Sequence, residues 1–263
     1  MKLALKALFA VSALLFGLLA FAGYFDDNVL VRIPATAKPT SAHSHLAAVY
    51  FSGDVGYRVA MGRMIGNRLA ADGIPVVAIN SLGYFRQHRT VAEVSTLTAE
   101  AIRQALTFGH ADHVILIGHS LGADALQAAL VQLPHELRSR VRAVVLIVPT
   151  GALHLQVTPG EMLEWSRPDA EVLPTLRQLT WVPTTCIYGI KETDSPCPQL
   201  SATNVRKVEL PGGHALDWNI DGVHTALIGA IDAAASRNIT KYSGQDHLTA
   251  RLVSAKGEHP QAD

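Results

Sequence analysis

One pentapeptide in this sequence has the residue types and spacing for covalent chemistry. GHSLG (118–122) places Ser120 between two glycines, directly after the aliphatic run 113–118 and before a stretch with helical spacing. A Gly-x-Ser-x-Gly turn from a strand into a helix is a nucleophile elbow, too tight for side chains two positions from the serine. The pattern predicts a nucleophile near a helix N-terminus, where backbone N–H groups stabilise an oxyanion. The alternative is a turn serine that takes part in no reaction.

A serine hydroxyl needs a neighbouring base to become a nucleophile, and one histidine has the setting for that role. In proteins with this elbow the chain order is serine, acid, histidine. His214 lies in the glycine-rich segment LPGGHALDW, just after the predicted strand 205–213, and is the predicted base. His119 lies inside the elbow, where we expect its side chain to point away, and His224 falls on the closing helix.

The acid that orients the histidine is expected on the loop after the predicted strand 182–189. The segment YGIKETDSPC offers two carboxylates there. Glu192 is closer to the end of the strand, whereas Asp194 has the side chain that is more usual in this role. The sequence favours Glu192 slightly and leaves Asp194 open, and the other residue would then cap the loop or bond to its backbone.

An oxyanion hole needs a second backbone N–H besides that of the residue after the nucleophile. The segment FSGDVGY (51–57) follows the predicted strand 46–52, and its glycines allow the backbone to approach a substrate oxygen. The N–H groups of Asp54 and Leu121 are the predicted pair. A plain glycine-rich turn between a strand and a helix is the alternative for 51–57.

The two cysteines predict a disulfide rather than a metal site. Cys186 and Cys197 flank IYGIKETDSP, so an oxidising compartment favours a bridge that closes this loop and holds the enclosed acid in place. Two independent thiols are the alternative. His43 and His45 have no third ligand at a suitable spacing and are interpreted as part of a surface loop. We expect neither a metal nor a cofactor.

The elements that position these residues alternate along the chain. Aliphatic runs bounded by turn residues predict buried strands, and apolar residues at helical spacing predict helices between them. Thr90 and Glu93 form a capping box at the start of one helix. Continuous aliphatic strands between helices indicate a mostly parallel sheet covered on both faces. The predicted strands are 46–52, 74–80, 113–118, 141–149, 182–189 and 205–213, and the predicted helices are about 57–73, 90–109, 120–134 and 222–237.

The segment 150–180 interrupts the alternation, because prolines and glycines such as Pro159 and Gly160 break it. It predicts a small insertion or cap over the site. Its apolar residues either form the surface of that cap or pack on the core, and the sequence favours neither. They are Leu153, Leu155, Met162, Leu163 and Trp165.

The start of the chain is typical of an exported protein. Lys2 and Lys6 precede the uncharged apolar run 7–22, which ends in the small-x-small pattern of a cleavage site. The run is slightly shorter than the roughly 20 residues that cross a bilayer. A secretory signal is therefore predicted, with an uncleaved anchor as the alternative. The predicted organisation is 1–22 signal or anchor, 23–45 linker, 46–237 α/β domain and 238–263 polar tail.

Composition excludes one large class of partner. The 263 residues are 49% hydrophobic and 17% charged, with a formal net charge of zero. No run of Lys or Arg forms a stripe that would bind phosphates, so we expect no nucleic-acid partner. A chain of this size can bury a sizeable core in one large domain.

Together, several segments resemble the VirJ/AcvB-type bacterial virulence-protein domain. They are YFSGDVGY, GIPVVAINSLGYF with the following RT, GHSLGAD, CIYGIKETDSPCP and LPGGHALD, in order over about 46–235. The resemblance implies an α/β-hydrolase fold in the periplasm, with Ser120, His214 and the Glu192/Asp194 pair as its catalytic residues. The chain departs from the usual motifs at positions that concern the substrate pocket rather than these residues, namely Val55, Tyr57, Gly83, Arg86, His119, Leu121 and Ala215.

The resemblance implies two kinds of activity. Some members of the family are linked to type IV secretion of DNA or protein, and others hydrolyse aminoacyl-phosphatidylglycerol. The favoured hypothesis is an exported serine ester hydrolase that acts on this lipid head group, either secreted or tethered to the inner membrane. The alternatives are a non-catalytic periplasmic binding factor that contacts secretion-system proteins, and a general esterase or lipase with another ester substrate.

Overall fold

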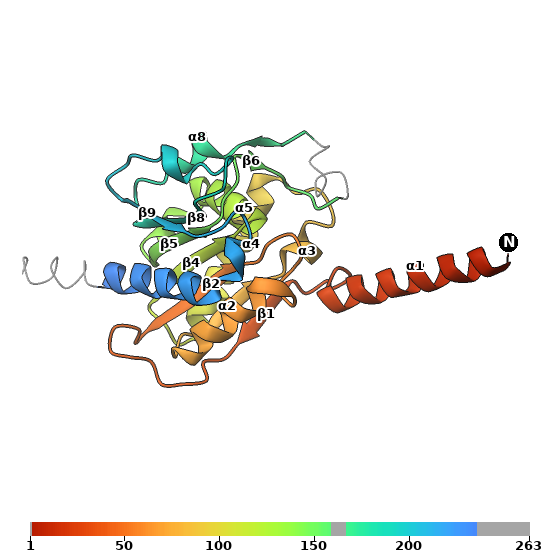
Figure 1. Cartoon of the computed structure of the whole chain (residues 1–263). Helices are drawn as coiled ribbons and strands as arrows, with labels where there is room; N and C mark the ends of the chain where they lie inside the picture. Colours follow the sequence, from red (N-terminus) through yellow and green to blue (C-terminus); the bar gives the residue numbers. More distant parts are fainter. Residues whose placement is uncertain (1, 159–166, 236–263) are drawn as a thin grey trace, which may run out of the picture.

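The computed structural model of the protein, which describes residues 2–158 and 167–235, has a central seven-stranded sheet (Figure 1). The strand order is β1-β3-β2-β4-β5-β8-β9. β1 is antiparallel to β3, and every other neighbouring pair is parallel, which confirms the predicted sheet. The strands are β1 (Leu30–Ile33), β2 (Leu46–Phe51), β3 (Val76–Ile79), β4 (His113–His119), β5 (Val141–Ile147), β8 (Thr184–Gly189) and β9 (Val205–Leu210).

Two hydrophobic cores lie on the two faces of the sheet, because successive side chains of a strand point to opposite faces. In β2, Val49 and Phe51 belong to one core, whereas Ala48 and Tyr50 belong to the other. All four side chains are fully buried. Burial on both faces explains why the strands appear in the sequence as unbroken aliphatic runs rather than as alternating patterns.

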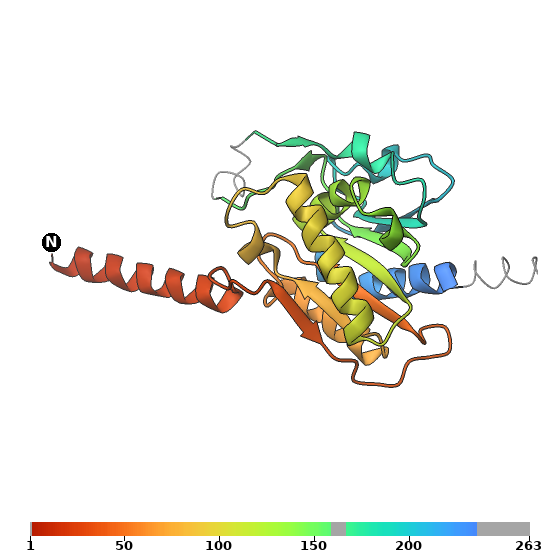
Figure 2. The same ribbon diagram turned by 180° about the vertical axis from the view of Figure 1, so that it is seen from behind.

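Helices cover both faces, as the view from behind also shows (Figure 2). Residues of α4 and α5 contribute to the first core, and residues of α2 and of a helix over 220–235 contribute to the second. The capping box predicted at the start of α4 is confirmed, since Thr90 Oγ1 accepts from the Glu93 N–H and the Glu93 carboxylate accepts from the Thr90 N–H. The helices are α1 (Lys2–Ala22), α2 (Ala60–Ala71), α3 (Ser81–Tyr84), α4 (Val91–Phe108), α5 (Leu121–Val131), α6 (His135–Arg138) and α8 (Val172–Leu176).

The stretch 23–45 differs from the predicted linker. Its residues Leu30–Ile33 form β1, which pairs antiparallel with β3 at the edge of the sheet. His43, interpreted as part of a surface loop, is only 5% exposed, and its Nε2 lies 3.0 Å from an oxygen of Asp232. This stretch is therefore integrated into the domain by an edge strand and by a buried histidine.

The described parts of the segment 150–180 contact α5. They include the two-stranded pair β6 (Ala152–Leu153) and β7 (Ala170–Glu171), followed by α8. Leu153 and Leu155 are buried in the first core, so they pack on the domain rather than form an exposed cap surface. Pro159, Gly160, Met162, Leu163 and Trp165 lie outside the described residues, as does the predicted tail 238–263.

Candidate active site

Ser120 occupies the sharp turn between β4 and α5. Its backbone has φ 52° and ψ −125°, a left-handed conformation that L-residues rarely adopt. A Cβ on Gly118 would lie 2.5 Å from Ala123 Cα, and one on Gly122 would collide with the carbonyl oxygen of Ser52. Both positions therefore require glycine, because neighbouring backbone atoms lie too close to leave room for a side chain. The local geometry is that of the predicted nucleophile elbow.

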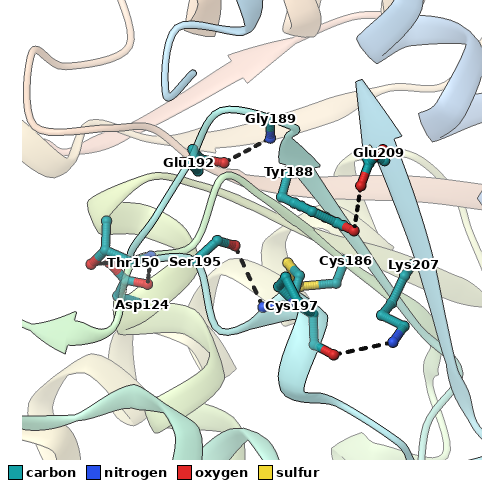
Figure 3. Close-up of a disulfide and its surroundings, with 11 residues drawn as sticks. Asp124, Thr150, Cys186, Tyr188, Gly189, Glu192, Ser195, Cys197, Lys207 and Glu209 are labelled. Atoms are coloured by element: carbon teal, nitrogen blue, oxygen red, sulfur yellow. Dashed lines mark hydrogen bonds between the residues drawn. A yellow bond between two sulfur atoms is a disulfide. The ribbon is translucent and has the colours of Figure 1, made fainter. Parts of the chain in front are cut away.

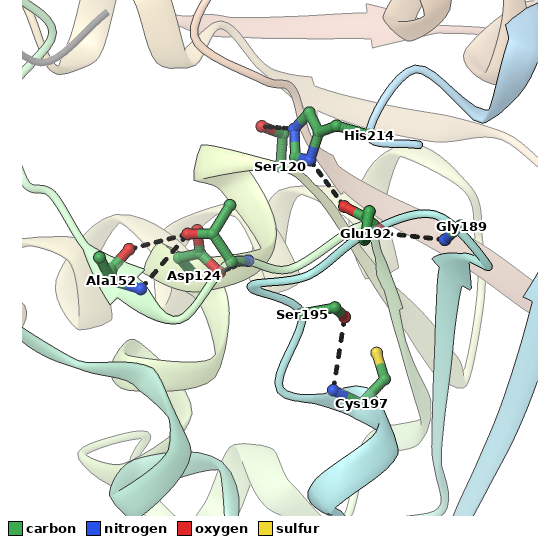
Figure 4. Close-up of polar contacts among 9 residues, drawn as sticks. Ser120, Asp124, Ala152, Gly189, Glu192, Ser195, Cys197 and His214 are labelled. Carbon is green, nitrogen blue, oxygen red and sulfur yellow. Dashed lines mark hydrogen bonds and ion pairs between the residues drawn. The ribbon is translucent and has the colours of Figure 1, made fainter. Parts of the chain in front are cut away.

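Three predicted side chains form one hydrogen-bonded chain (Figure 4). Ser120 Oγ lies 2.8 Å from His214 Nε2, and His214 Nδ1 lies 2.8 Å from Glu192 Oε1. Because Nδ1 faces a carboxylate, it carries the ring proton, which leaves Nε2 to accept the serine proton. The three residues follow β4, β8 and β9, whose carboxyl ends lie at the same edge of the sheet.

The structure distinguishes between the two candidate acids. The Glu192 N–H donates to the Gly189 carbonyl, and the resulting turn lets Glu192 Oε2 accept from the Gly189 N–H at 2.7 Å. The Glu192 side chain is only 2% exposed and reaches the imidazole. Asp194 is exposed and interacts with His214 through its charge rather than through a hydrogen bond. The structure thus brings together Ser120, His214 and Glu192 and leaves Asp194 at the surface.

The environment of His214 favours its protonated form. The hydrogen bond to Glu192 raises the pKa of His214 above its ordinary value of 6.5, and burial opposes this effect. The charges of Glu192, Asp194 and Asp54 also raise the pKa. A strong acceptor at Nδ1 thereby makes the imidazole a better base for the serine proton.

The raised pKa predicts the pH dependence of the reaction. Only neutral His214 can accept the Ser120 proton, so kcat/KM should rise with pH through an apparent pKa above 6.5 and then level off. Activity is lost as the pH falls through that value. Measuring kcat/KM from pH 5 to pH 9 tests this expectation. Replacing Glu192 by Gln should move the midpoint downward, and a midpoint unchanged by that substitution would contradict the assignment.

A cavity of about 120 Å³ lies beside the nucleophile. In the described part of the chain, the backbone N–H groups of Asp54 and Leu121 donate to no protein acceptor. This leaves both N–H groups available, although their role as an oxyanion hole remains a prediction. The residues that line the cavity are Asp54, Ser120, Leu121, Asp124, Thr150, Ala152, His154, Gln156 and Val157.

The environment of His119, the residue before Ser120, favours its neutral form. Burial and the nearby charge of His214 lower the pKa of His119 to about 4. Its Nδ1 lies next to Gly53, at 3.5 Å from where a Cβ on that glycine would stand. The ring of His119 therefore lies beside the loop after β2, and the hydrogen bond of the Ser120 hydroxyl is to His214.

Asp124 is a buried acid that the sequence analysis did not single out. It is 2% exposed, and its two carboxyl oxygens lie 3.0 Å from the Thr150 N–H nitrogen and 2.8 Å from Thr150 Oγ1. Thr150 Oγ1 also lies 3.0 Å from the Ala152 carbonyl, and one hydroxyl proton cannot serve both acceptors. Burial raises the pKa of Asp124 well above its ordinary range and so favours the protonated acid, whereas the hydrogen bonds from Thr150 lower the pKa. This network ties the start of 150–180 to α5.

The predicted disulfide is confirmed (Figure 3). Cys186 lies in β8 and Cys197 in a short 3₁₀ turn (Cys197–Gln199), and both are fully buried. The bridge closes the loop that contains Glu192, which fixes the path of the chain on both sides of the acid. As for metals, the described residues contain no group of three or more His, Cys, Asp or Glu side chains that could hold an ion.

Strand order, elbow and loop placement together define the α/β-hydrolase fold, and solved structures agree. The chain is similar to BpoC of Mycobacterium tuberculosis (17% identity, TM-score 0.55, covering 78% of this chain and 96% of that one). It is also similar to a lipase-esterase related protein of Clostridium acetobutylicum (15% identity, TM-score 0.52, covering 76% of this chain and 99% of that one). A third similar structure is Est1E of Butyrivibrio proteoclasticus (16% identity, TM-score 0.51, covering 78% of this chain and 96% of that one). At these identities the likeness establishes the fold alone.

The family follows from the sequence. Residues 45–235 match the model of the bacterial virulence protein (VirJ) family, so the chain belongs to that family. This confirms the resemblance that the motifs indicated. No curated protein matches the chain in a sequence search.

Proposed function

We propose that the protein is an exported serine hydrolase that cleaves a carboxylic ester, with aminoacyl-phosphatidylglycerol as the favoured substrate. The observation that supports the reaction is the hydrogen-bonded chain from Ser120 through His214 to Glu192 at a strained elbow. Packing alone does not require a serine, a histidine and a buried carboxylate in one line beside a cavity. Their arrangement fits nucleophilic catalysis of acyl transfer.

The reaction proceeds in two halves. Ser120 Oγ attacks the ester carbonyl while His214 Nε2 takes its proton, and Glu192 stabilises the imidazolium that forms. The N–H groups of Asp54 and Leu121 receive the developing oxyanion. The imidazolium then gives its proton to the leaving alcohol, here the head-group glycerol of the lipid. A water, activated by the same imidazole, attacks the acyl-enzyme and releases the amino acid.

The cavity supports an acyl group that is small and positively charged. Its volume of about 120 Å³ is far below the roughly 300–1,000 Å³ of sites for drug-sized ligands, which suits a small acyl group better than a long fatty chain. The Asp54 carboxylate lines the cavity, and no Lys or Arg is among the described lining residues. An α-ammonium group complements this charge, whereas an anionic acyl group would be repelled.

The test is hydrolysis by the purified full-length protein in vesicles that contain alanyl- or lysyl-phosphatidylglycerol. We expect release of the free amino acid, measured by mass spectrometry, and no release by the Ser120→Ala variant. Vesicles of phosphatidylglycerol without the amino acid, assayed for free fatty acid, serve as the comparison. Fatty acid release without amino acid release would replace the favoured substrate by the general lipase alternative. A folded protein inactive on every ester would favour the binding factor.

A further inference from the structure

Large apolar side chains are exposed around the candidate site. Outside α1, five such side chains are more than a third exposed in the described residues, and three of them lie on the loops of the site. Val55 (39%) follows Asp54, Ile190 (61%) is two residues before Glu192, and Trp218 (61%) is four residues after His214. We name Val55, Ile190 and Trp218 the apolar rim. The other two exposed side chains are Phe25 and Met64.

Backbone hydrogen bonds hold the loops of the apolar rim together. The Ile190 N–H donates to the Leu210 carbonyl, and the Lys191 N–H donates to the Gly212 carbonyl, both at 2.9 Å. The loop of the acid therefore runs beside the loop of the histidine. The loop of Val55 joins them at the cavity, where Asp54 and Ser120 are both lining residues. The exposed apolar side chains thus come from three loops that meet at the nucleophile.

An unusual backbone conformation turns Trp218 outward. Leu216, Asp217 and Trp218 all have positive φ values, of 50°, 49° and 57°. Three consecutive L-residues in this region are sterically unfavourable, and such outliers cluster at functional sites. Leu216 is fully buried in the second core while Trp218 remains exposed. The turn thereby places the largest apolar side chain of the rim in solvent, at a conformational cost.

The helix α1 has the properties of a membrane span. Ala4–Ala22 is 19 residues long with a mean hydropathy of 2.2, and none of it is buried. At 1.5 Å per residue this length is close to the roughly 30 Å hydrocarbon core of a bilayer. By the positive-inside rule, Lys2 and Lys6 favour a cytoplasmic N-terminus for such a span, which would put the domain on the opposite side. α1 projects from the domain on the side opposite to the far end of the C-terminal helix (Figure 1).

The end of α1 is fixed to the loop that contains Val55. Buried Asn80 donates through Nδ2 to the Gly23 carbonyl at 2.9 Å and accepts at Oδ1 from the Tyr57 N–H at 3.3 Å. Asp26 forms an ion pair with Arg58 at 2.6 Å. No flexible spacer therefore separates α1 from the site. The side chain of Asn80 links Gly23, the residue after the helix, to the loop that contains Val55.

We propose that the apolar rim docks on the surface of the bilayer that α1 spans, so that the mouth of the site opens at the level of the lipid head groups. Tryptophan is suited to this position because its ring is apolar and its N–H bonds to interfacial water. The proposal deepens the proposed function, since it places the same site against a lipid surface. Its binding test does not require the protein to be catalytic.

The first test measures contact with lipid directly. The full-length protein is reconstituted into nanodiscs of phosphatidylethanolamine and phosphatidylglycerol, with and without brominated acyl chains. We expect brominated lipid to quench tryptophan fluorescence in the wild type, and the Trp218→Phe variant to lose most of the quenchable signal. Equal quenching in both proteins would overturn the proposal. The proposal would also be overturned if the protein isolated from cells began at Gly23, because α1 would then be absent.

The second test separates docking from chemistry. Trp218→Ser and Ile190→Ser should lower the ratio of kcat/KM for a vesicle-embedded aminoacyl lipid to kcat/KM for a soluble ester of the same amino acid, by about tenfold or more. Met64→Ser, an exposed residue on α2, should leave the ratio unchanged. An unchanged ratio in the rim variants, or a change in their oligomeric state instead, would overturn the proposal. If the wild-type protein hydrolysed neither the aminoacyl lipid nor the soluble ester, the proposed function would be refuted. The quenching result would still test the docking.

Discussion

Ser120→Ala should abolish covalent labelling by a fluorophosphonate probe and lower kcat for ester hydrolysis by about 10⁴- to 10⁶-fold. In the proposed mechanism the Ser120 oxygen forms the bond to the acyl group, and alanine has no oxygen at that position. The partner of Ser120 Oγ is His214 Nε2, which lies 2.8 Å away and would have no proton to accept. Residual activity would come from water in the pocket and from the oxyanion N–H groups. Gel fluorescence after labelling and steady-state kinetics measure the two effects.

The matched control for this variant is Ser139→Ala. Ser139 is exposed, and its Oγ donates only to the nearby Glu136 carbonyl, so labelling should persist at the wild-type level. Alanine at position 120 keeps the backbone conformation of the elbow, and circular dichroism should show an unchanged fold. Labelling of Ser120→Ala equal to that of the wild type would mean that the probe reacts elsewhere and that Ser120 is not the nucleophile.

The second large effect is expected from Glu192→Gln, which should reduce kcat by about 10³- to 10⁴-fold. The amide keeps the volume of the acid but can donate to His214 Nδ1. The imidazole proton would then reside on Nε2, where it blocks acceptance of the serine proton. The amide also gives no charge to stabilise the imidazolium. Stopped-flow or discontinuous ester assays on the purified variant measure the loss.

Asp194→Asn provides the comparison that makes this result specific. Asp194 is exposed and affects His214 only through its charge, so its loss should change kcat by no more than a few-fold. Both variants must retain the Cys186–Cys197 bridge, checked by mass before and after alkylation. A larger loss in Asp194→Asn than in Glu192→Gln would assign the acid to Asp194 and reject the hydrogen-bonded chain described for Glu192.

The loops of the candidate site were predictable because their signals are local. Gly-x-Ser-x-Gly between an aliphatic run and a helical pattern indicates the elbow, and a histidine in a glycine-rich loop after the last strand is expected at the same edge of the sheet. The choice between Glu192 and Asp194 was not decided by the sequence, because it depends on the turn that the chain makes after Gly189. The hydrogen bond from the Glu192 N–H to the Gly189 carbonyl creates that turn and directs Glu192 inward.

Features that depend on distant partners were missed. β1 is only four residues long and lies at the edge of the sheet, where it pairs with β3 alone. Four residues between polar stretches and Pro34 are too few to show a distinctive strand pattern. Asp124 was visible as an acid on an otherwise apolar helix, but its burial depends on Thr150, from a different segment. His43 likewise contacts Asp232, which lies 189 residues away in the sequence.

The bridge between Cys186 and Cys197 links catalytic competence to the surroundings of the chain. In a reducing compartment the loop with Glu192 would be closed by no covalent bond and would be free to leave His214 without its partner. Oxidation restricts the conformations of that loop before any substrate arrives. If the protein is exported and acts as proposed, the loop that carries Glu192 would be closed covalently only after the chain has reached an oxidising compartment.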